Sequence, residues 1–212
     1  MKLYSAPDPA PNPRRVRIFM VEKGIAMPEV MVSLRDREHK APEFRAKNPW
    51  GQVPTLELDD GRTISETVAI CRYLEALHPT PPLFGRDAFE QAEVEMWTRR
   101  VELTLMTPVG MFWRHAHPYT AHLLTQYKDF GESNRDLYMA ACTLIDRALA
   151  DGRPFLVGEA YTMADICAQS TVDFASFTGL EPPESAAHLA AWRARVSARP
   201  SAQPNARIAD AA

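Results

Sequence analysis

Long apolar runs are missing from this 212-residue sequence, and no stretch approaches the roughly 18 consecutive apolar residues of a membrane-spanning helix. An excess of positive charge is missing too. The 24 Lys and Arg residues stand against 27 Asp and Glu, so a surface built for nucleic-acid phosphates is not expected. The start of the chain, MKLYSAP, runs into prolines instead of an apolar signal segment. We therefore expect a cytoplasmic protein that neither spans a membrane nor binds nucleic acid.

Cysteine is scarce. Cys71, Cys142 and Cys167 lie far apart, in neither a CxxC pair nor a metal-ligand spacing. Such residues are typical of reduced thiols that fill a core in the cytosol. Neither a disulfide nor a bound metal is expected. The hydrophobic content of 46% is enough for a sizeable core, which argues against disorder of the whole chain.

The first third of the chain alternates short extended and helical patterns. A helix is expected from Pro13, with Asn12 as its N-cap and Gly24 as its stop. The turn at residues 59–61 predicts a hairpin. The expected order is strand 2–5, helix 13–23, strand 29–33, helix 42–47, hairpin 55–64 and helix 65–77.

Strand patterns vanish in the second half. The proline-dense residues 79–86 are the best linker candidate, so we expect a first domain over 1–78 and a second over 87–200. The second domain is expected to be an all-α bundle. Its helical patterns cover about 87–114, 121–150, 163–178 and 185–199. The tail, 201–212, has little to bury.

Four motifs occur in an order that resembles the glutathione S-transferase superfamily, in its bacterial, cytosolic type. They are NPRRV at 12–16, NPWGQVP at 48–54, SET at 65–67 and TMAD at 162–165. The resemblance implies an α+β protein: an N-terminal thioredoxin-like domain of order βαβαββα, followed by an all-α helical bundle domain. It also implies glutathione as co-substrate and a homodimer.

Glutathione binding is implied for the second and third motifs. A cis bond at Val53–Pro54, beside Gln52, would leave the Val53 backbone free to pair with the peptide, as a strand adds to an open edge. Glu66 could pair with the γ-glutamyl ammonium, while Thr67 and the helix start hold its carboxylate. Helix capping by this motif is an alternative.

His39 and Lys40 resemble the segment that family members place near the glycine carboxylate, although a solvated pair without function is an alternative. The TMAD motif has the spacing of a capping box, and we interpret it as structural. The arginines at 14, 15 and 17 could attract the anionic tripeptide, or form a solvated helix face.

Stabilisation of the glutathione thiolate needs a donor near the first helix start. The family's serine position is occupied by Ala10, and its tyrosine position by Ser5. Asn12 matches an asparagine whose amide is proposed to contact the thiol in some members. Asn12 and Ser5 are therefore the catalytic candidates, with pure capping by Asn12 as the alternative.

The electrophile is expected to bind between the domains. The segment 106–115 is rich in Met and aromatic residues, and its Met106, Met111 and Phe112 are candidates for an apolar wall. Core or dimer interface is the alternative for each. Pro108 and Gly110 predict a bend or break in the helix.

The expected activity is conjugation of the glutathione thiolate to a small apolar electrophile. One alternative is glutathione-dependent reduction of disulfides or peroxides. A covalent cysteine mechanism is disfavoured because the first helix start has no Cys. The other alternative is a non-catalytic binding protein of the same fold.

Overall fold

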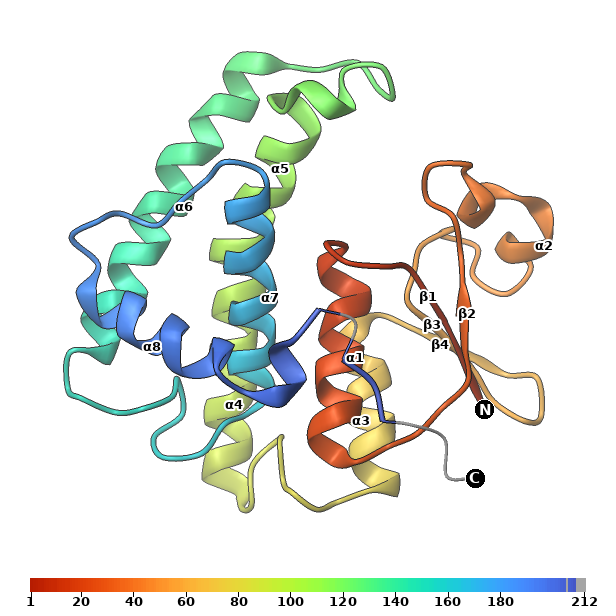
Figure 1. The fold of residues 1–212 in the computed structure, drawn as a ribbon, viewed down its shortest axis with the longest axis horizontal. Helices are drawn as coiled ribbons and strands as arrows, with labels where there is room; N and C mark the ends of the chain where they lie inside the picture. The colour runs from red at the N-terminus through yellow and green to blue at the C-terminus, as the bar shows by residue number, and fades with distance from the viewer. Residues whose placement is uncertain (205, 209–212) are drawn as a thin grey trace. The chain divides into compact units, whose positions relative to one another are not determined.

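The computed structural model describes residues 1–204 and 206–208, which fall into two compact units. Unit 1 comprises Met1–Pro82 and the described residues from Pro200 onward, and unit 2 comprises Leu83–Arg199 (Figure 1). The change of unit after Pro82 lies inside residues 79–86, the expected linker. No helix in the described part of the chain combines the length and apolarity needed to cross a membrane.

Unit 1 is built on a four-stranded mixed sheet of order β2-β1-β3-β4. Strand β1 runs parallel to β2 and antiparallel to β3, and β3 and β4 form the hairpin. Helices α1 and α3 pack together on one side of the strands, and α2 lies on the other (Figure 1). The elements are β1 (Lys2–Ser5), α1 (Pro11–Lys23), β2 (Glu29–Met31), α2 (Pro42–Arg45), β3 (Thr55–Glu57), β4 (Thr63–Ser65) and α3 (Thr67–Leu77). The α+β fold class and the order βαβαββα are confirmed.

The alternation of β1 separates two faces of this sheet. Tyr4 and Ala6 join a buried apolar cluster that includes Phe44 of α2. Ser5 points to the opposite face, where Arg17 of α1 donates a hydrogen bond to its hydroxyl at 2.9 Å. Alternate residues of this strand therefore face opposite sides of the sheet, one covered by α2 and the other by α1.

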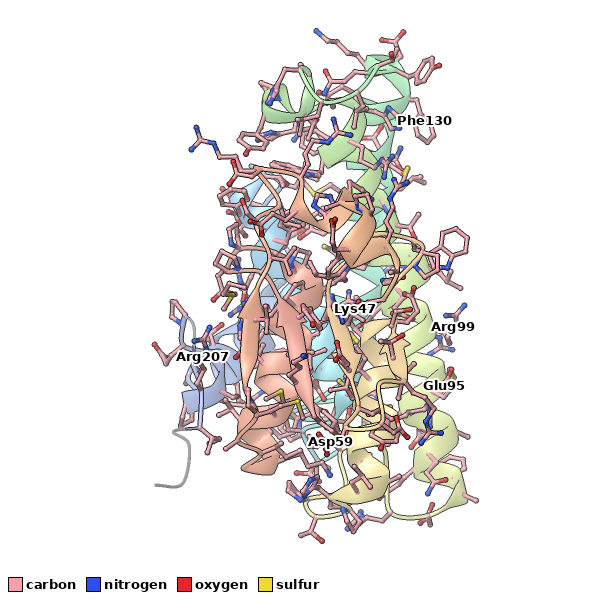
Figure 2. All side chains as sticks on the ribbon, turned by 90° about the vertical axis from the view of Figure 1, so that its right-hand side faces the viewer. Lys47, Asp59, Glu95, Arg99, Phe130 and Arg207 are labelled. Carbon is pink, nitrogen blue, oxygen red and sulfur yellow. The ribbon has the colours of Figure 1, made fainter. Side chains whose placement is uncertain are left out.

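An ion-pair cluster holds the Tyr4 hydroxyl. The Glu57 carboxylate accepts hydrogen bonds from Lys47 at 2.7 Å and from Tyr4 at 2.9 Å; Lys47 is labelled in Figure 2. These bonds, that of Lys47 first, lower the pKa of Glu57 to about 2. The only tyrosine of β1 therefore donates within the cluster.

Several expectations for unit 1 need correction; β2 and α2, for example, each end two residues earlier than expected. Helix α1 begins at Pro11, two residues earlier than expected, and its N-cap is Ala10. Pro11 is tolerated there because a first-turn N–H has no intrahelical partner. Helix α3 begins at Thr67, after the expected Ser65. The segment after Pro200 is not merely a polar tail, because Ser201 and Ala202 are buried and Arg14 donates to the Ala202 carbonyl at 3.0 Å.

Unit 2 is a helical bundle around α7, whose side chains are buried along most of its length. Helix α7 packs against α4 and α8, and α6 packs against α5 and α8. The helices are α4 (Ala88–Arg100), α5 (Thr107–His115), α6 (Lys128–Leu149), α7 (Met163–Phe177) and α8 (Ala187–Ser197). The expectation of an all-helical second domain is confirmed.

The expected helices of unit 2 differ in detail. The helical rod does not break at Pro108 and Gly110; a π-helical turn, Val101–Met106, joins α4 to α5 just before them. Pro108 is the second residue of α5, which directly follows this π-helical turn. The next helix starts at Lys128 rather than at residue 121, after a short 3-10 turn at Pro118–Thr120.

The TMAD motif forms the predicted capping box at the start of α7. Asp165 is fully buried, which raises the pKa of its carboxyl group, and four donated hydrogen bonds oppose that shift. Two come from Thr162, one from the Leu156 backbone at 2.9 Å and one from the Trp192 indole at 2.9 Å. Asp165 thus joins three separate segments of unit 2.

We predict that Asp165→Ala destabilises the protein by about 3 kcal/mol or more, because the Leu156 and Trp192 N–H groups are left buried and unpaired. Asp136→Ala, on the exposed side of α6, is the matched control and should change stability by less than about 0.5 kcal/mol. Urea unfolding followed by circular dichroism measures both. Equal midpoints for the two variants would contradict the prediction.

Candidate functional site

Strand register brings three predicted segments to one end of the sheet in unit 1. Tyr4 pairs with Thr55, and Thr55 pairs with Ser65. The end of β1 and the residues that precede β3 and follow β4 therefore lie side by side. The predicted site residues among them are Ser5, Val53, Pro54, Glu66 and Thr67.

The peptide bond between Val53 and Pro54 is cis, as expected from the resemblance. Neither the N–H nor the C=O of Val53 has a hydrogen-bond partner among residues 1–204 and 206–208. The Val53 side chain is buried in the cluster of Tyr4 and Phe44, which anchors this stretch of backbone. A donor and an acceptor on one residue are what an incoming extended peptide needs.

The loop that leads to Val53 is held from several sides. The Asn48 amide donates to the Gln52 carbonyl at 2.9 Å, and Lys40 Nζ donates to the Gly51 carbonyl at 2.6 Å. Gly51 has a φ of 57°, and a Cβ there would lie 2.6 Å from the His39 carbonyl oxygen. Only glycine fits this close approach.

Glu66 occupies a strained position at the start of α3. Its φ is 70°, in the region that side-chain-bearing residues avoid, and its side chain is exposed. Thr67, the first residue of α3, is buried. Because Ser65 lies within β4 and Glu66 supplies no side-chain cap within the described residues, the capping interpretation of this motif is wrong. No side-chain cap therefore offsets the strained backbone of Glu66 in the described part of the chain.

The two catalytic candidates lie in different surroundings. Asn12 is exposed in the first turn of α1 and gives no side-chain cap among the residues described, so pure capping is wrong for it. Ser5 is completely buried, and its hydroxyl accepts the hydrogen bond from Arg17. Only Asn12 presents its side chain to solvent.

The chain matches two models of one protein family. The model of the glutathione S-transferase N-terminal domain matches residues 10–77, and that of the C-terminal domain matches 121–200. Glutathione S-transferase 2 of Saccharomyces cerevisiae is 38% identical over 205 residues, which cover 95% of this chain and 87% of that protein. This chain belongs to the glutathione S-transferase family.

Solved structures agree with the sequence comparisons. The crystal structure of Gtt2 from Saccharomyces cerevisiae has a TM-score of 0.89 at 38% identity, covering 95% of this chain and 98% of that one. A glutathione S-transferase domain-containing protein of Marinobacter aquaeolei also has a TM-score of 0.89 at 38% identity, covering 96% of this chain and all of the other. The protein is therefore a transferase enzyme of this family.

The remaining predicted binding residues in unit 1 of this glutathione transferase are His39, Lys40 and Gln52. Burial, and then the neighbouring charge of Lys40, lower the pKa of His39, so its imidazole is neutral at pH 7. Lys40 Nζ donates to the Trp50 carbonyl at 3.3 Å and to the Gly51 carbonyl at 2.6 Å. Gln52 is exposed next to Val53. Lys40 is thus the better placed of the predicted pair for an anionic group.

Unit 2 carries the candidates for the electrophile wall. Phe112 is buried in the core of unit 2, and the Arg135 guanidinium stacks 4.9 Å from its ring centre. Met106 and Met111 are partly exposed. The core interpretation therefore fits Phe112 best, while the two methionines remain candidates.

Unit 2 contains an aromatic cluster that was not predicted from the sequence. Trp113 of α5 lies 5.4 Å from Tyr119 and 5.5 Å from Phe174, measured between ring centres. Tyr119 and Phe177 are each more than half exposed. Trp113 stands in the aromatic-rich segment noted above, but only the packing of α5 on α7 reveals its partners.

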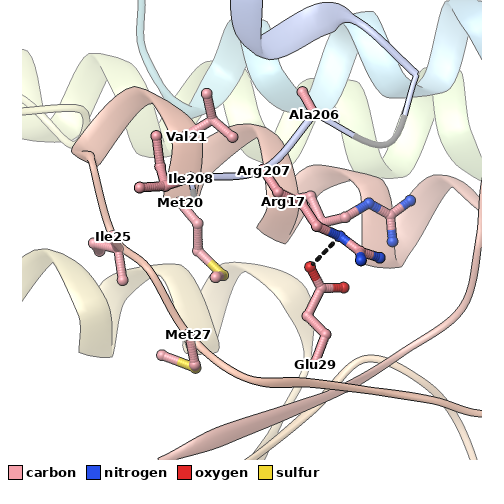
Figure 3. Close-up of a pocket in the computed structure, with 9 residues that line it drawn as sticks. All are labelled: Arg17, Met20, Val21, Ile25, Met27, Glu29, Ala206, Arg207 and Ile208. Atoms are coloured by element: carbon pink, nitrogen blue, oxygen red, sulfur yellow. Dashed lines mark ion pairs between the residues drawn. The ribbon is translucent and has the colours of Figure 1, made fainter. Parts of the chain in front are cut away.

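A cavity of about 250 Å³ in unit 1 is bordered by Arg17, the residue that bonds Ser5. Figure 3 shows its lining, in which Arg207 pairs with Glu29 at 3.0 Å. None of its lining residues is a predicted site residue. They are Arg17, Met20, Val21, Ile25, Met27, Glu29, Ala206, Arg207 and Ile208.

We predict that Glu66→Gly raises the KM for glutathione about tenfold or more. The variant loses the charge-assisted hydrogen bond between Glu66 and the γ-glutamyl ammonium, which is worth about 1.5–3 kcal/mol. Stability should be unchanged or higher, since glycine adopts the φ of 70° without strain. Arg37→Gly is the matched control, with a φ of 60° in unit 1. It relieves similar strain and should leave the KM unchanged. Steady-state kinetics and urea unfolding test both variants; a normal KM in Glu66→Gly would exclude the assigned role.

Proposed function

We propose that this enzyme binds glutathione at the sheet end of unit 1, stabilises its thiolate and transfers the thiolate to a small apolar electrophile. The cysteinyl backbone of glutathione pairs with the N–H and C=O of Val53. Glu66 binds the γ-glutamyl ammonium, and Thr67 with the start of α3 binds the adjacent carboxylate. Lys40, with His39 and Gln52 nearby, lies toward the glycine carboxylate.

One observation carries this proposal. An unpaired backbone donor and acceptor at Val53 lie beside a strained carboxylate at Glu66, because Thr55 and Ser65 are paired in the hairpin. Glutathione offers the complementary groups, a peptide and an ammonium with a carboxylate on one carbon. A protein without such a ligand would gain nothing from either feature.

Thiolate stabilisation is assigned to Asn12. Pro11 and Pro13 have no N–H and Ala10 has no hydroxyl, so the first turn of α1 offers the backbone N–H of Asn12 and its side-chain amide. Both would add to the positive end of the helix dipole. Ser5 is a weaker candidate because it is buried and already bonded to Arg17.

Conjugation is a substitution at an electrophilic carbon. The thiolate sulfur attacks the electrophilic carbon, a C–S bond forms, and the leaving group departs with the electron pair of the bond that breaks. Met106 and Met111 of unit 2 are proposed to contact the apolar part of the electrophile. We further propose that the enzyme is a cytoplasmic homodimer, as the family resemblance implies.

Retention on immobilised glutathione, followed by turnover of chlorodinitrobenzene, tests the activity. We expect specific elution by free glutathione and release of chloride with formation of the thioether. Elution without turnover of any electrophile would instead identify a binding protein. Reduction of a disulfide or peroxide in the absence of conjugation would favour the reductase alternative. Failure to bind glutathione would overturn the proposal.

We predict that Asn12→Ala raises the pKa of the bound thiol and lowers kcat/KM about tenfold near neutral pH, the effect of losing roughly 1.4 kcal/mol of thiolate stabilisation. Asn12→Ser retains a donor and should recover part of the loss. The thiolate absorbance of bound glutathione, titrated against pH, measures the shift. An unchanged titration would remove the Asn12 side chain from the mechanism.

A further inference from the structure

Arg17 of α1 is not part of a solvated helix face. Its side chain is only 3% exposed, and that of Arg15 is 2% exposed, whereas Arg14 is partly exposed. A long side chain on a helix leans toward the helix N-terminus, so the Arg17 guanidinium reaches back toward the segment that precedes α1. Figure 3 shows Arg17 bordering the cavity beside Glu29 and Arg207.

The guanidinium contacts three positions of one short segment. Nη1 donates to the Ser5 hydroxyl at 2.9 Å and to the Ala6 carbonyl at 2.7 Å. Nη2 donates to the Asp8 carboxylate, which forms an ion pair with it. The planar fork of arginine can serve these divergent acceptors at once, and a lysine ammonium cannot reproduce that geometry.

This segment has few backbone hydrogen bonds of its own. Pro7 and Pro9 carry no N–H. The Val32 N–H donates to the Ser5 carbonyl at 2.8 Å at the start of the segment. The Ala10 N–H donates to the Pro7 carbonyl at 3.2 Å near its end. The three bonds of Arg17 fall between these ends, so they replace the regular pairing that the prolines prevent.

The segment also sets where α1 begins. Asp8 is followed directly by Pro9 and by Ala10, the N-cap of α1, and Asn12 lies two residues further on. A change in the path of residues 5–8 therefore moves the first turn of the helix. A displacement of about 1 Å at a reacting group can cost about a hundredfold in rate.

We propose that Arg17 is a positioning residue for thiolate formation: by bonding Ser5, Ala6 and Asp8 it holds the start of α1, and hence Asn12, where the glutathione thiol ionises. This inference rests on the proposed function. Arg17 does not touch glutathione in this role. Its charge is balanced by Asp8, and Glu29 and Arg207 are the other charged groups that line the neighbouring cavity.

The test compares Arg17→Lys with Arg14→Lys. Both substitutions retain the charge on the same helix, but the Arg14 guanidinium bonds the Ala202 carbonyl rather than residues 5–8. For Arg17→Lys we expect the pKa of the bound thiol to rise and kcat/KM to fall about tenfold at a pH below that pKa, which corresponds to a shift of about one unit. Above the thiol pKa the variant should approach the wild-type rate. Arg14→Lys should titrate like the wild type.

A merely structural role gives a different result. It would lower kcat/KM by the same factor at every pH and leave the thiol titration unchanged, and either finding overturns the proposal. Urea unfolding and the affinity for glutathione are measured alongside. If the wild type itself binds no glutathione or does not lower the thiol pKa, the proposed function fails, independently of Arg17.

Asp8→Asn provides a second variant in case Arg17→Lys does not fold. Loss of the negative charge alone would favour a nearby thiolate and lower its pKa. Loss of the bond to Arg17 loosens the segment and should raise the pKa. A raised thiol pKa supports positioning by Arg17; a lowered or unchanged one overturns it.

Discussion

The free backbone of Val53 is the constraint on which the proposed glutathione site depends. Its N–H and C=O have no partner in the described part of the chain, although the side chain of the same residue is buried in the core of unit 1. Unpaired backbone groups are tolerated where water or a ligand can satisfy them. The surrounding loop is held by contacts: Asn48 and Lys40 bond its carbonyls, and Gly51 permits the close approach of the His39 backbone.

Electrostatics at this end of unit 1 is organised by helix starts rather than by a cluster of exposed cations. The first turns of α1 and α3 both follow strands of the sheet, so their positive ends suit an anionic peptide with two carboxylates and an ionising thiol. The two turns are supported differently. The Arg17 side chain bonds the segment before α1, whereas Glu66, before α3, has a strained backbone and an exposed side chain. Precision in the first turn then matters more than added charge.

The two units differ in the chemistry of the groups that they present. Unit 1 has a specific set of polar and backbone groups, whereas unit 2 offers an aromatic cluster around Trp113 and two partly exposed methionines. Polar groups at fixed positions discriminate strongly between ligands, and apolar surfaces discriminate weakly. A transferase that accepts one thiol and a range of electrophiles is consistent with this division. The capping box at Asp165 stabilises unit 2 without taking part in the chemistry.

The sequence by itself determined the order of strands and helices, the all-helical second half and the capping box, because each rests on local patterns or on a motif of fixed spacing. The cis bond at Val53–Pro54 was expected only from the resemblance to the glutathione S-transferase family. Tertiary structure decided what local patterns leave open. Ser5 and Asn12 were equal candidates along the chain, and only the packing of α1 on the sheet buries one and exposes the other. The same packing buries Arg17, which was expected on the surface, and brings it into contact with residues 5–8. Whether a residue is buried depends on which helices and strands pack together. Residues that are close in the sequence do not specify that packing by themselves.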